Sequence, residues 1–513
     1  MPRCSVLLVA LLSLTARADV TLAPLFTDHA VLQQDKPVPV WGRAAPEEKI
    51  TVTFRDQTVH ATAGKDGSWI VYLAALKPGS PADLVVAGTN TVRLTDVVVG
   101  EVWVCAGQSN MEFRVWGPPG DVYRVDDADA EVAAATHPLI RDFKVERAVA
   151  AKPADTAKGA WVVCSPQTAG SFTAVGYFFA RDLAARLDVP IGIIDCTWGG
   201  TAIESWLSDA ALKSDPAFMV VGERWAQALA EAPRLRAERE ATLAKLAQDE
   251  AAAKAAGPER LAEFQKHVPW MPPLPGSDSP DVPGGLFNGM VNPLLPGAIR
   301  GVLWYQGESN VGRPGEYGAL FRALITFWRQ HWGQGDFPFL FVQLPDYRDP
   351  GDPSGFAWAR LREAQASALA LPNTGMAVTI DIGDPANIHP RHKQEVGRRL
   401  ALIARHEVYN IPGNWSGPLF KAAVREGAAL RVTFDHSGSG LLAQEKPLAG
   451  FVIAGADRHF YPAAAQIDNG SVVVSAPQVK EPVAVRYAWA DDPDANLFDG
   501  AGLPAAPFRS DNW

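Results

Sequence analysis

Residues 97–111 read VVVGEVWVCAGQSNM, a nearly continuous apolar run that ends in Gly107-Gln108-Ser109-Asn110-Met111. Such a run is typical of a strand buried on both faces of a sheet. Gly107 permits a sharp turn, after which a short helix can begin. The turn would lift the Ser109 hydroxyl to the carboxyl edge of the sheet, with the backbone N–H of Ser109 directed at whatever the hydroxyl attacks. This geometry suits an acyl-transfer nucleophile, and a serine that only caps the helix is the plainer alternative.

The chain as a whole has 513 residues, which is too long for one core and predicts several domains. Its formal net charge of −10, with no block of like charge, argues against a nucleic-acid partner. Residues 1–18 have the pattern of a secretory signal peptide, with Arg3, a short apolar run and the cleavage site Ala16-Arg17-Ala18. That run is too short to cross a bilayer, and no later stretch is long and apolar enough. We therefore expect a secreted or periplasmic protein without a membrane span.

Three cysteines, Cys105, Cys164 and Cys196, remain beyond the signal peptide. An odd number allows at most one bridge, so the fold is not built on disulfides. Cys105 and Cys196 fall in predicted core strands, where buried free thiols are expected.

The patterning divides the chain into several regions. Residues 19–97 hold short β segments and turns, which predict an N-terminal β-sandwich. Strands then alternate with helices over 98–222 and 286–411, which predicts a parallel sheet covered by helices on both faces. An Ala/Glu/Lys/Arg-rich and then Pro-rich stretch at 223–285 interrupts this alternation as a helical insertion. Residues 412–513 return to short β segments, which form either a second β-domain or strands that complete the first.

Four loops that follow predicted strands carry polar residues suited to catalysis. Active sites of such sheets lie at the carboxyl ends of the strands. Each loop also has a plain reading as a turn or a helix cap, but their common position at one edge favours a site. The loops are the Ser109 turn, Trp198-Gly199-Gly200-Thr201, Gln306-Gly307-Glu308-Ser309-Asn310 and Asp381 to His389.

His389 precedes Pro390 and a predicted helix, so it falls near the helix start at the rim of the sheet. A histidine there can reach a serine hydroxyl on another strand end, and it needs a carboxylate to hold its tautomer. Asp384 in the same loop and Glu308 on the neighbouring loop are both candidates.

Metal chemistry is the competing interpretation of the last loop. Asp381, Asp384, His389 and His392 form an acidic and histidine cluster, but no cysteine or Glu-x-x-His spacing supports zinc. We predict no metal and no cofactor. A Gly-x-Ser-x-Gly elbow is also absent at Ser109, so the common α/β-hydrolase fold is not indicated.

Together the four loops resemble, in order, the blocks of the sialate O-acetylesterase-like branch of the SGNH hydrolases. The matching stretches are Gly107–Met111, Trp198–Thr201, Trp304–Ser309 and Ile388–Pro390, with a tail from Leu503 to Asp511. The likeness spans most of the chain after the signal peptide. It implies a three-layer α/β/α fold with a flavodoxin-like sheet, flanked by β-sandwich segments at both termini.

This resemblance implies that Ser109 is the nucleophile and His389 the general base. The amides of Ser109 and Gly200 and a side chain of the third block would form the oxyanion hole. That block usually offers Asn, whereas this chain has Gln306 in the block, so Gln306 is the expected donor.

The acid of the triad is less regular. The superfamily tends to place it three residues before the histidine, where this chain has Ala386, whereas Asp384 stands five before. Asp384 and Glu308 therefore both stay open. Four further residues of these loops are assigned to substrate binding: Gln108, Asn110, Trp198 and Asn310.

The function expected is that of a secreted serine esterase that removes acetyl groups from a carbohydrate through an acyl-enzyme. Its partner would be an acetylated oligosaccharide or polysaccharide, from sialate or from hemicellulose such as xylan or xyloglucan. A lipase or thioesterase with the same triad, a non-catalytic carbohydrate-binding protein and a metal-dependent deacetylase are the alternatives.

Overall fold

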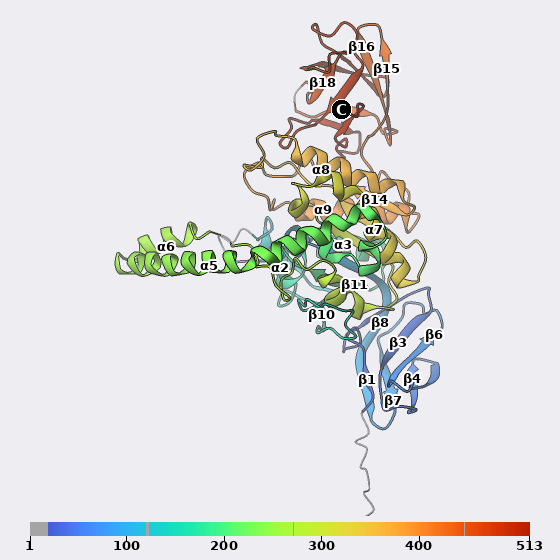
Figure 1. Cartoon of the computed structure of the whole chain (residues 1–513). Coiled ribbons are helices and arrows are strands. Elements are labelled where there is room, and N and C mark those ends of the chain that lie inside the picture. Colours follow the sequence, from blue (N-terminus) through green and yellow to red (C-terminus); the bar gives the residue numbers. More distant parts are fainter. Residues whose placement is uncertain (1–18, 119–122, 270, 446) are drawn as a thin grey trace, which may run out of the picture.

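The computed structural model of the chain describes residues 19–118, 123–269, 271–445 and 447–513 (Figure 1). The signal peptide expected at residues 1–18 lies outside this part. Within the part that is described, no helix is both long and apolar enough to cross a bilayer.

A seven-stranded sheet forms the centre of the molecule. Its strand order is β10-β9-β11-β8-β12-β13-β14, and every pairing is parallel except that of the edge strand β10. The chain places β11 on one side of β8 and β12 on the other, so β8 lies at a switch point, where α/β sheets bind ligands. The strands are β8 (Thr91–Gly107), β9 (His137–Lys144), β10 (Trp161–Cys164), β11 (Ile191–Thr197), β12 (Gly301–Tyr305), β13 (Phe339–Val342) and β14 (Thr374–Ala377).

Helices cover both faces of this sheet. On one face Phe179 of α3 (Ala174–Leu187) packs edge-on against Trp103 at 5.0 Å between ring centroids, and α9 (Lys393–Glu407) packs against α3. On the other, Phe321 of α7 (Pro314–Trp332) stacks on Trp304, beside α8 (Ala357–Ala366). Trp103 lies in register with Gly301, three residues before Trp304, and side chains alternate along a strand, so the two tryptophans point to opposite faces. The predicted three-layer α/β/α fold is confirmed.

Strand β8 also belongs to the N-terminal β region. Its first half pairs antiparallel with β7 (Ala82–Ala87), and Val98–Gly100 pairs parallel with β2 (Val31–Gln33). The expected bound between residues 97 and 98 falls inside this one strand, and the division of the chain into domains stays a prediction. The other N-terminal strands are β1 (Thr21–Leu22), β3 (Val38–Arg43), β4 (Lys49–Phe54), β5 (Gln57–Thr62) and β6 (Ser68–Leu73).

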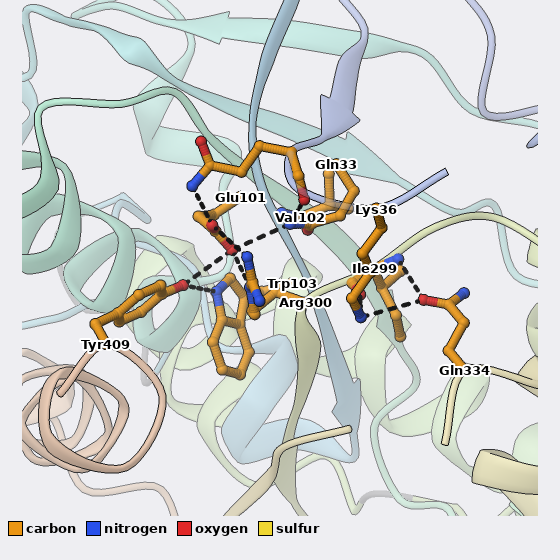
Figure 2. A network of polar contacts seen from close by, with 10 residues as sticks. Gln33, Lys36, Glu101, Val102, Trp103, Ile299, Arg300, Gln334 and Tyr409 are labelled. Carbon is orange, nitrogen blue, oxygen red and sulfur yellow. Dashed lines mark hydrogen bonds and ion pairs between the residues drawn. The ribbon is translucent and has the colours of Figure 1, made fainter. Parts of the chain in front are cut away.

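A buried carboxylate joins these two parts of β8 to their surroundings (Figure 2). Glu101 is fully buried, and its oxygens accept hydrogen bonds from Arg300 Nε at 2.5 Å and Tyr409 Oη at 3.1 Å. Gln33 of β2 donates to Glu101 at 3.3 Å. A buried charge needs such partners. The network therefore fixes the N-terminal strands, β12 and the end of α9 around one point of β8.

The helical insertion is a long arm, α5 (Met219–Ala255) followed by α6 (Pro258–Lys266), that projects from the side of the molecule (Figure 1). Only two residues of α5, Val221 and Ala232, are buried. Short helices α2 (Ala128–Ala134) and α4 (Asp209–Leu212) lie elsewhere along the chain.

The C-terminal strands pair with one another, within the described residues, around a separate apolar core that includes Val432, Ile453 and Tyr487. They lie at the end of the molecule opposite the N-terminal sheets (Figure 1). These strands are β15 (Leu419–Glu426), β16 (Ala429–Asp435), β17 (Leu441–Ala443), β18 (Phe451–Ala454), β19 (Phe460–Pro462), β20 (Ala464–Asp468), β21 (Ser471–Ser475), β22 (Ala484–Tyr487), β23 (Leu497–Asp499) and β24 (Phe508–Arg509).

The cysteines agree with the sequence prediction. Cys105, Cys164 and Cys196 are free and buried, and burial raises the pKa of each thiol.

Replacing Glu101 tests how strongly the network of Figure 2 stabilises the fold. Glu101→Gln keeps the shape of the side chain but leaves the largely buried Arg300 guanidinium without its counter-charge, so the free energy of unfolding should fall by about 3–5 kcal/mol. Urea denaturation followed by tryptophan fluorescence measures the change. Asp83→Asn, in the exposed Arg93–Asp83 pair, is the control and should cost at most about 1 kcal/mol. Equal midpoints for the two variants would contradict the prediction.

Candidate active site

The turn after β8 presents Ser109 at the start of α1 (Ser109–Glu112). Gly107 has a φ of +136°, and a Cβ there would lie 2.1 Å from the carbonyl oxygen of Tyr305, so the turn requires glycine. Gln108 is the N-cap residue of α1 and makes no side-chain cap bond. The alternative that Ser109 serves as the helix cap is therefore excluded.

His389 meets the Ser109 hydroxyl from the loop that follows β14. Its Nε2 lies 2.8 Å from Ser109 Oγ, although the two residues are 280 positions apart. His389 lies three residues before the N-cap of α9, which is His392. Burial and the nearby Lys393 ammonium lower the pKa of His389 to about 4. The imidazole is therefore neutral near pH 7 and free to accept a proton.

Neither candidate acid contacts this imidazole within the described residues. Asp384 Oδ1 accepts a hydrogen bond from the backbone N–H of Ala386 at 2.9 Å, which closes the turn. Glu308 Oε1 accepts one from Asn110 Nδ2 at 2.6 Å. The geometry thus presents a serine–histidine pair, and both carboxylates proposed for the triad have other partners.

Asn110, expected to bind substrate, is fully buried and bonded instead to two loops and the start of α9. Its Nδ2 donates to Glu308 and, at 3.0 Å, to the carbonyl of Ile388, while its Oδ1 accepts from Lys393 Nζ at 2.7 Å. Lys393 is also fully buried and donates to the carbonyl of Pro390 at 2.6 Å. Burial raises the pKa of Glu308 and lowers that of Lys393 to about 7. Asn110 therefore joins the serine and histidine loops and does not face a ligand.

Gln306 and Asn310 likewise lie behind the wall of the site. The Gln306 amide donates to Asn310 Oδ1 at 2.7 Å and to Gln108 Oε1 at 3.2 Å, and Asn310 donates to Glu204 at 2.8 Å. Both are buried, so neither side chain is placed to meet a substrate. Gln108, in contrast, lines the cavity, and its Nε2 has no hydrogen-bond partner among the residues described.

The second loop supplies backbone donors and an aromatic face. The Gly199 amide donates to Glu112 Oε2 at 2.8 Å, whereas the Gly200 amide has no partner in the described part of the chain. Gly200, with a φ of +76°, lines the cavity together with Trp198. The Arg147 guanidinium lies over the Trp198 ring, 5.3 Å from its centroid.

These residues surround a cavity of about 1,020 Å³ that contains Ser109 and His389. The Tyr123 ring lies 4.8 Å from the imidazole, and Trp116, 41% exposed, also lines the cavity. Met271 reaches the cavity from the loop after α6. Aromatic faces beside polar groups suit sugar rings, which have apolar faces and hydroxyl edges.

The residues considered for a metal have separate partners. Asp381 pairs with Arg399 at 2.6 Å, and His392 pairs with Asp126 at 3.0 Å. No group of histidine, cysteine or carboxylate side chains within the described ranges is arranged to hold an ion.

A serine–histidine pair at the switch point of a three-layer α/β/α sheet defines a hydrolase of the esterase type. The model of the family described as carbohydrate esterase, sialic acid-specific acetylesterase, matches residues 99–237 and 283–405, just over half of the chain. The chain belongs to this family, as the resemblance predicted.

Individual relatives agree with this assignment. The sialate O-acetylesterase of Rattus norvegicus is 30% identical over 98% of this chain and 96% of its own length. That of Homo sapiens is 28% identical over 91% of this chain and 88% of its own. The crystal structure of a carbohydrate acetylesterase from Xanthomonas citri superposes with a TM-score of 0.80, at 38% identity, over 96% of this chain and all of that one. The protein is therefore a carbohydrate acetylesterase.

The sequence analysis missed four residues of the site: Glu112, Tyr123 and Arg147 in the cavity lining, and the buried Lys393. The position of Lys393 three residues before Val396 and seven before Leu400 places it on the buried face of α9. A lysine in line with the apolar residues of a helix could have indicated a buried charge from the sequence alone.

Replacing Lys393 tests its effect on the histidine. Lys393→Met removes the ammonium but keeps the side chain long and apolar, so the pKa of His389 should rise above 4 and stay below 6.5, since burial persists. An NMR titration of the imidazole measures this value without reference to activity. Lys213→Met, at an exposed lysine paired with Asp209, should leave it unchanged. An unchanged titration in Lys393→Met would show that the ammonium does not act on His389.

Proposed function

We propose that this acetylesterase removes acetyl groups from a carbohydrate through a serine acyl-enzyme. The observation that carries the proposal is the 2.8 Å contact between Ser109 Oγ and His389 Nε2 in the wall of the large cavity. A nucleophile and a base within hydrogen-bond reach are the geometric requirement of such chemistry.

The reaction follows from this pair. His389 Nε2 takes the proton of Ser109 as Oγ attacks the acetyl carbonyl carbon. When the tetrahedral intermediate collapses, the sugar oxygen leaves with the proton from His389, and the acetyl group stays on Ser109. Water then attacks the acyl-enzyme while His389 takes its proton, and acetate leaves as the serine regains a proton.

The oxyanion of each intermediate needs donors fixed in advance. The backbone N–H groups of Ser109 and Gly200 fill this role, with Gln108 Nε2 as the side-chain donor in place of the buried Gln306. The Gln108 side chain is fixed in position for this role, because its Oε1 accepts hydrogen bonds from Gln306 and from the Ser309 backbone N–H, the latter at 3.1 Å. One such donor contributes about 2.7–4 kcal/mol to lowering the barrier in comparable sites.

The substrate we propose is an acetylated sugar of a sialoglycan or a hemicellulose. The rodent and human relatives are named sialate O-acetylesterases, and the bacterial structure is named a carbohydrate acetylesterase. Trp116, Tyr123 and Trp198 offer aromatic faces to such a sugar. Arg114 and Glu112 in the same lining disfavour the long apolar chains of a lipase substrate. Secretion, from the pattern of residues 1–18, would bring the protein to extracellular glycans.

Ser109→Ala tests the nucleophile. Without the hydroxyl no acyl-enzyme forms, so acetate release from p-nitrophenyl acetate should fall by about 10⁴-fold or more, with the melting temperature nearly unchanged. Ser437→Ala, at a serine of the C-terminal β region, is the control and should keep wild-type activity. Turnover by Ser109→Ala within tenfold of wild type would remove Ser109 from the mechanism.

The acid limb of the pH–rate profile tests the base. His389 must be neutral to accept the proton, so kcat/KM for a small neutral acetyl ester should fall only as the pH approaches about 4. The folded pKa lies below the unfolded value of 6.5, so the unfolded chain binds this proton first, and stability declines as the pH falls from 6.5 towards 4. Circular dichroism at each pH separates unfolding from titration. A limb near pH 6.5 in folded protein would contradict the assignment.

A further inference from the structure

A second, smaller cavity of about 290 Å³ adjoins the active-site cavity. Gly200 and Ser309 line both, so the two hollows meet next to the serine turn. Most of the remaining wall comes from the helical arm: the first turns of α5 contribute Arg224 and Trp225, and the loop after α6 contributes Asp281. Glu204 and Arg313 complete it from outside the arm.

The polar groups of this cavity are only partly satisfied by the protein. The Asp281 carboxylate has no hydrogen-bond or ion-pair partner among the described residues, and burial raises its pKa. Arg313 donates to Glu204 at 3.1 Å through one terminal nitrogen, while its Nε is buried without a partner. A ligand hydroxyl group in the cavity would supply a partner for the Asp281 carboxylate, whereas the enclosed Arg313 Nε is out of its reach.

The composition of the walls identifies the chemistry of that ligand. Trp225 is half-buried and presents a flat apolar ring beside these polar groups. The charges are of both signs, because Arg224 and Arg313 pair with Glu204 while the Asp281 carboxylate lines the same cavity, so the cavity does not select an anion. A neutral sugar ring has one apolar face and hydroxyl groups that both donate and accept. The volume of about 290 Å³ is just below the usual range of ligand cavities, about 300–1,000 Å³, and suits one ring.

We propose that this second cavity is a sugar-binding subsite for the residue next to the acetylated sugar. The protein then acts on acetylated oligosaccharides and polysaccharides in preference to acetylated monosaccharides. This inference rests on the proposed function. It also gives the arm a role: the base of α5 and the Pro-rich loop build the wall of the subsite. The family model leaves out residues 238–282, which include the outer arm and Asp281.

The test compares substrates of different length on the same variants. Wild type should hydrolyse acetylated xylotetraose, or O-acetyl sialyllactose, at least tenfold better in kcat/KM than acetylated xylose or free O-acetyl sialic acid. Trp225→Ala should lower kcat/KM for the oligosaccharide about tenfold, mainly through KM, and leave p-nitrophenyl acetate and the monosaccharide within twofold. Asp281→Asn, which is nearly isosteric at a carboxylate without a partner, should act in the same direction without loss of stability.

Leu229→Ala is the matched control, since Leu229 lies one turn further along α5 and is 43% exposed. This variant should leave kcat/KM unchanged for both the oligosaccharide and p-nitrophenyl acetate. The subsite is overturned if wild type shows no preference for length, or if both cavity variants affect p-nitrophenyl acetate as much as the oligosaccharide. The outcome is distinct from failure of the proposed function, because Ser109→Ala alone reports on the nucleophile.

Discussion

The geometry of the site depends on one buried amide, that of Asn110. Its side chain has no access to water, so each of its hydrogen bonds must be made to the protein. The partners are Glu308 after β12, Ile388 after β14 and Lys393 at the start of α9. Because Asn110 follows Ser109 directly, these contacts fix the serine against the loop that carries the histidine. Strand ends far apart in the sequence are thereby held in one arrangement.

This same packing determines the protonation state of the base. Lys393 is buried between the rings of Phe113 and Tyr305, at 4.6 and 5.7 Å from their centroids, which stabilise a cation there. Its charge lies close enough to disfavour a second positive charge on His389. A group that positions the loops thus also keeps the imidazole neutral. No carboxylate contacts the His389 ring among the described residues. Lys393 therefore takes part both in positioning the histidine loop and in setting the charge of the imidazole.

The hydrophobic pattern of the sequence predicted best those strands that are buried on both faces. The apolar runs Ile191–Thr197 and Gly301–Tyr305 predict two strands, and β11 and β12 have these bounds, because both strands are buried on both faces and their apolar runs end where the sheet ends. Strand β5 has no apolar run of this kind, since every second residue is exposed at the edge of its sheet, so the sequence alone does not give its bounds. The position of the site was also predictable, because active sites of parallel α/β sheets lie at the carboxyl ends of the strands.

The direction of single side chains could not be predicted in this way. Gln306 and Asn310 carry amides in a loop at the right edge, yet they point into the protein. Besides bonding each other, they donate to Gln108, Thr201 and Glu204, which belong to other loops. The residues that carry out the reaction and those that contact the substrate sugars also belong to different parts of the fold. The serine and histidine follow strands of the central sheet and are held together through Asn110, whereas the loop after α6 brings Met271 to the large cavity and Asp281 to the small one. Since one loop borders both cavities, a change in the arm would alter which sugars fit without moving the nucleophile.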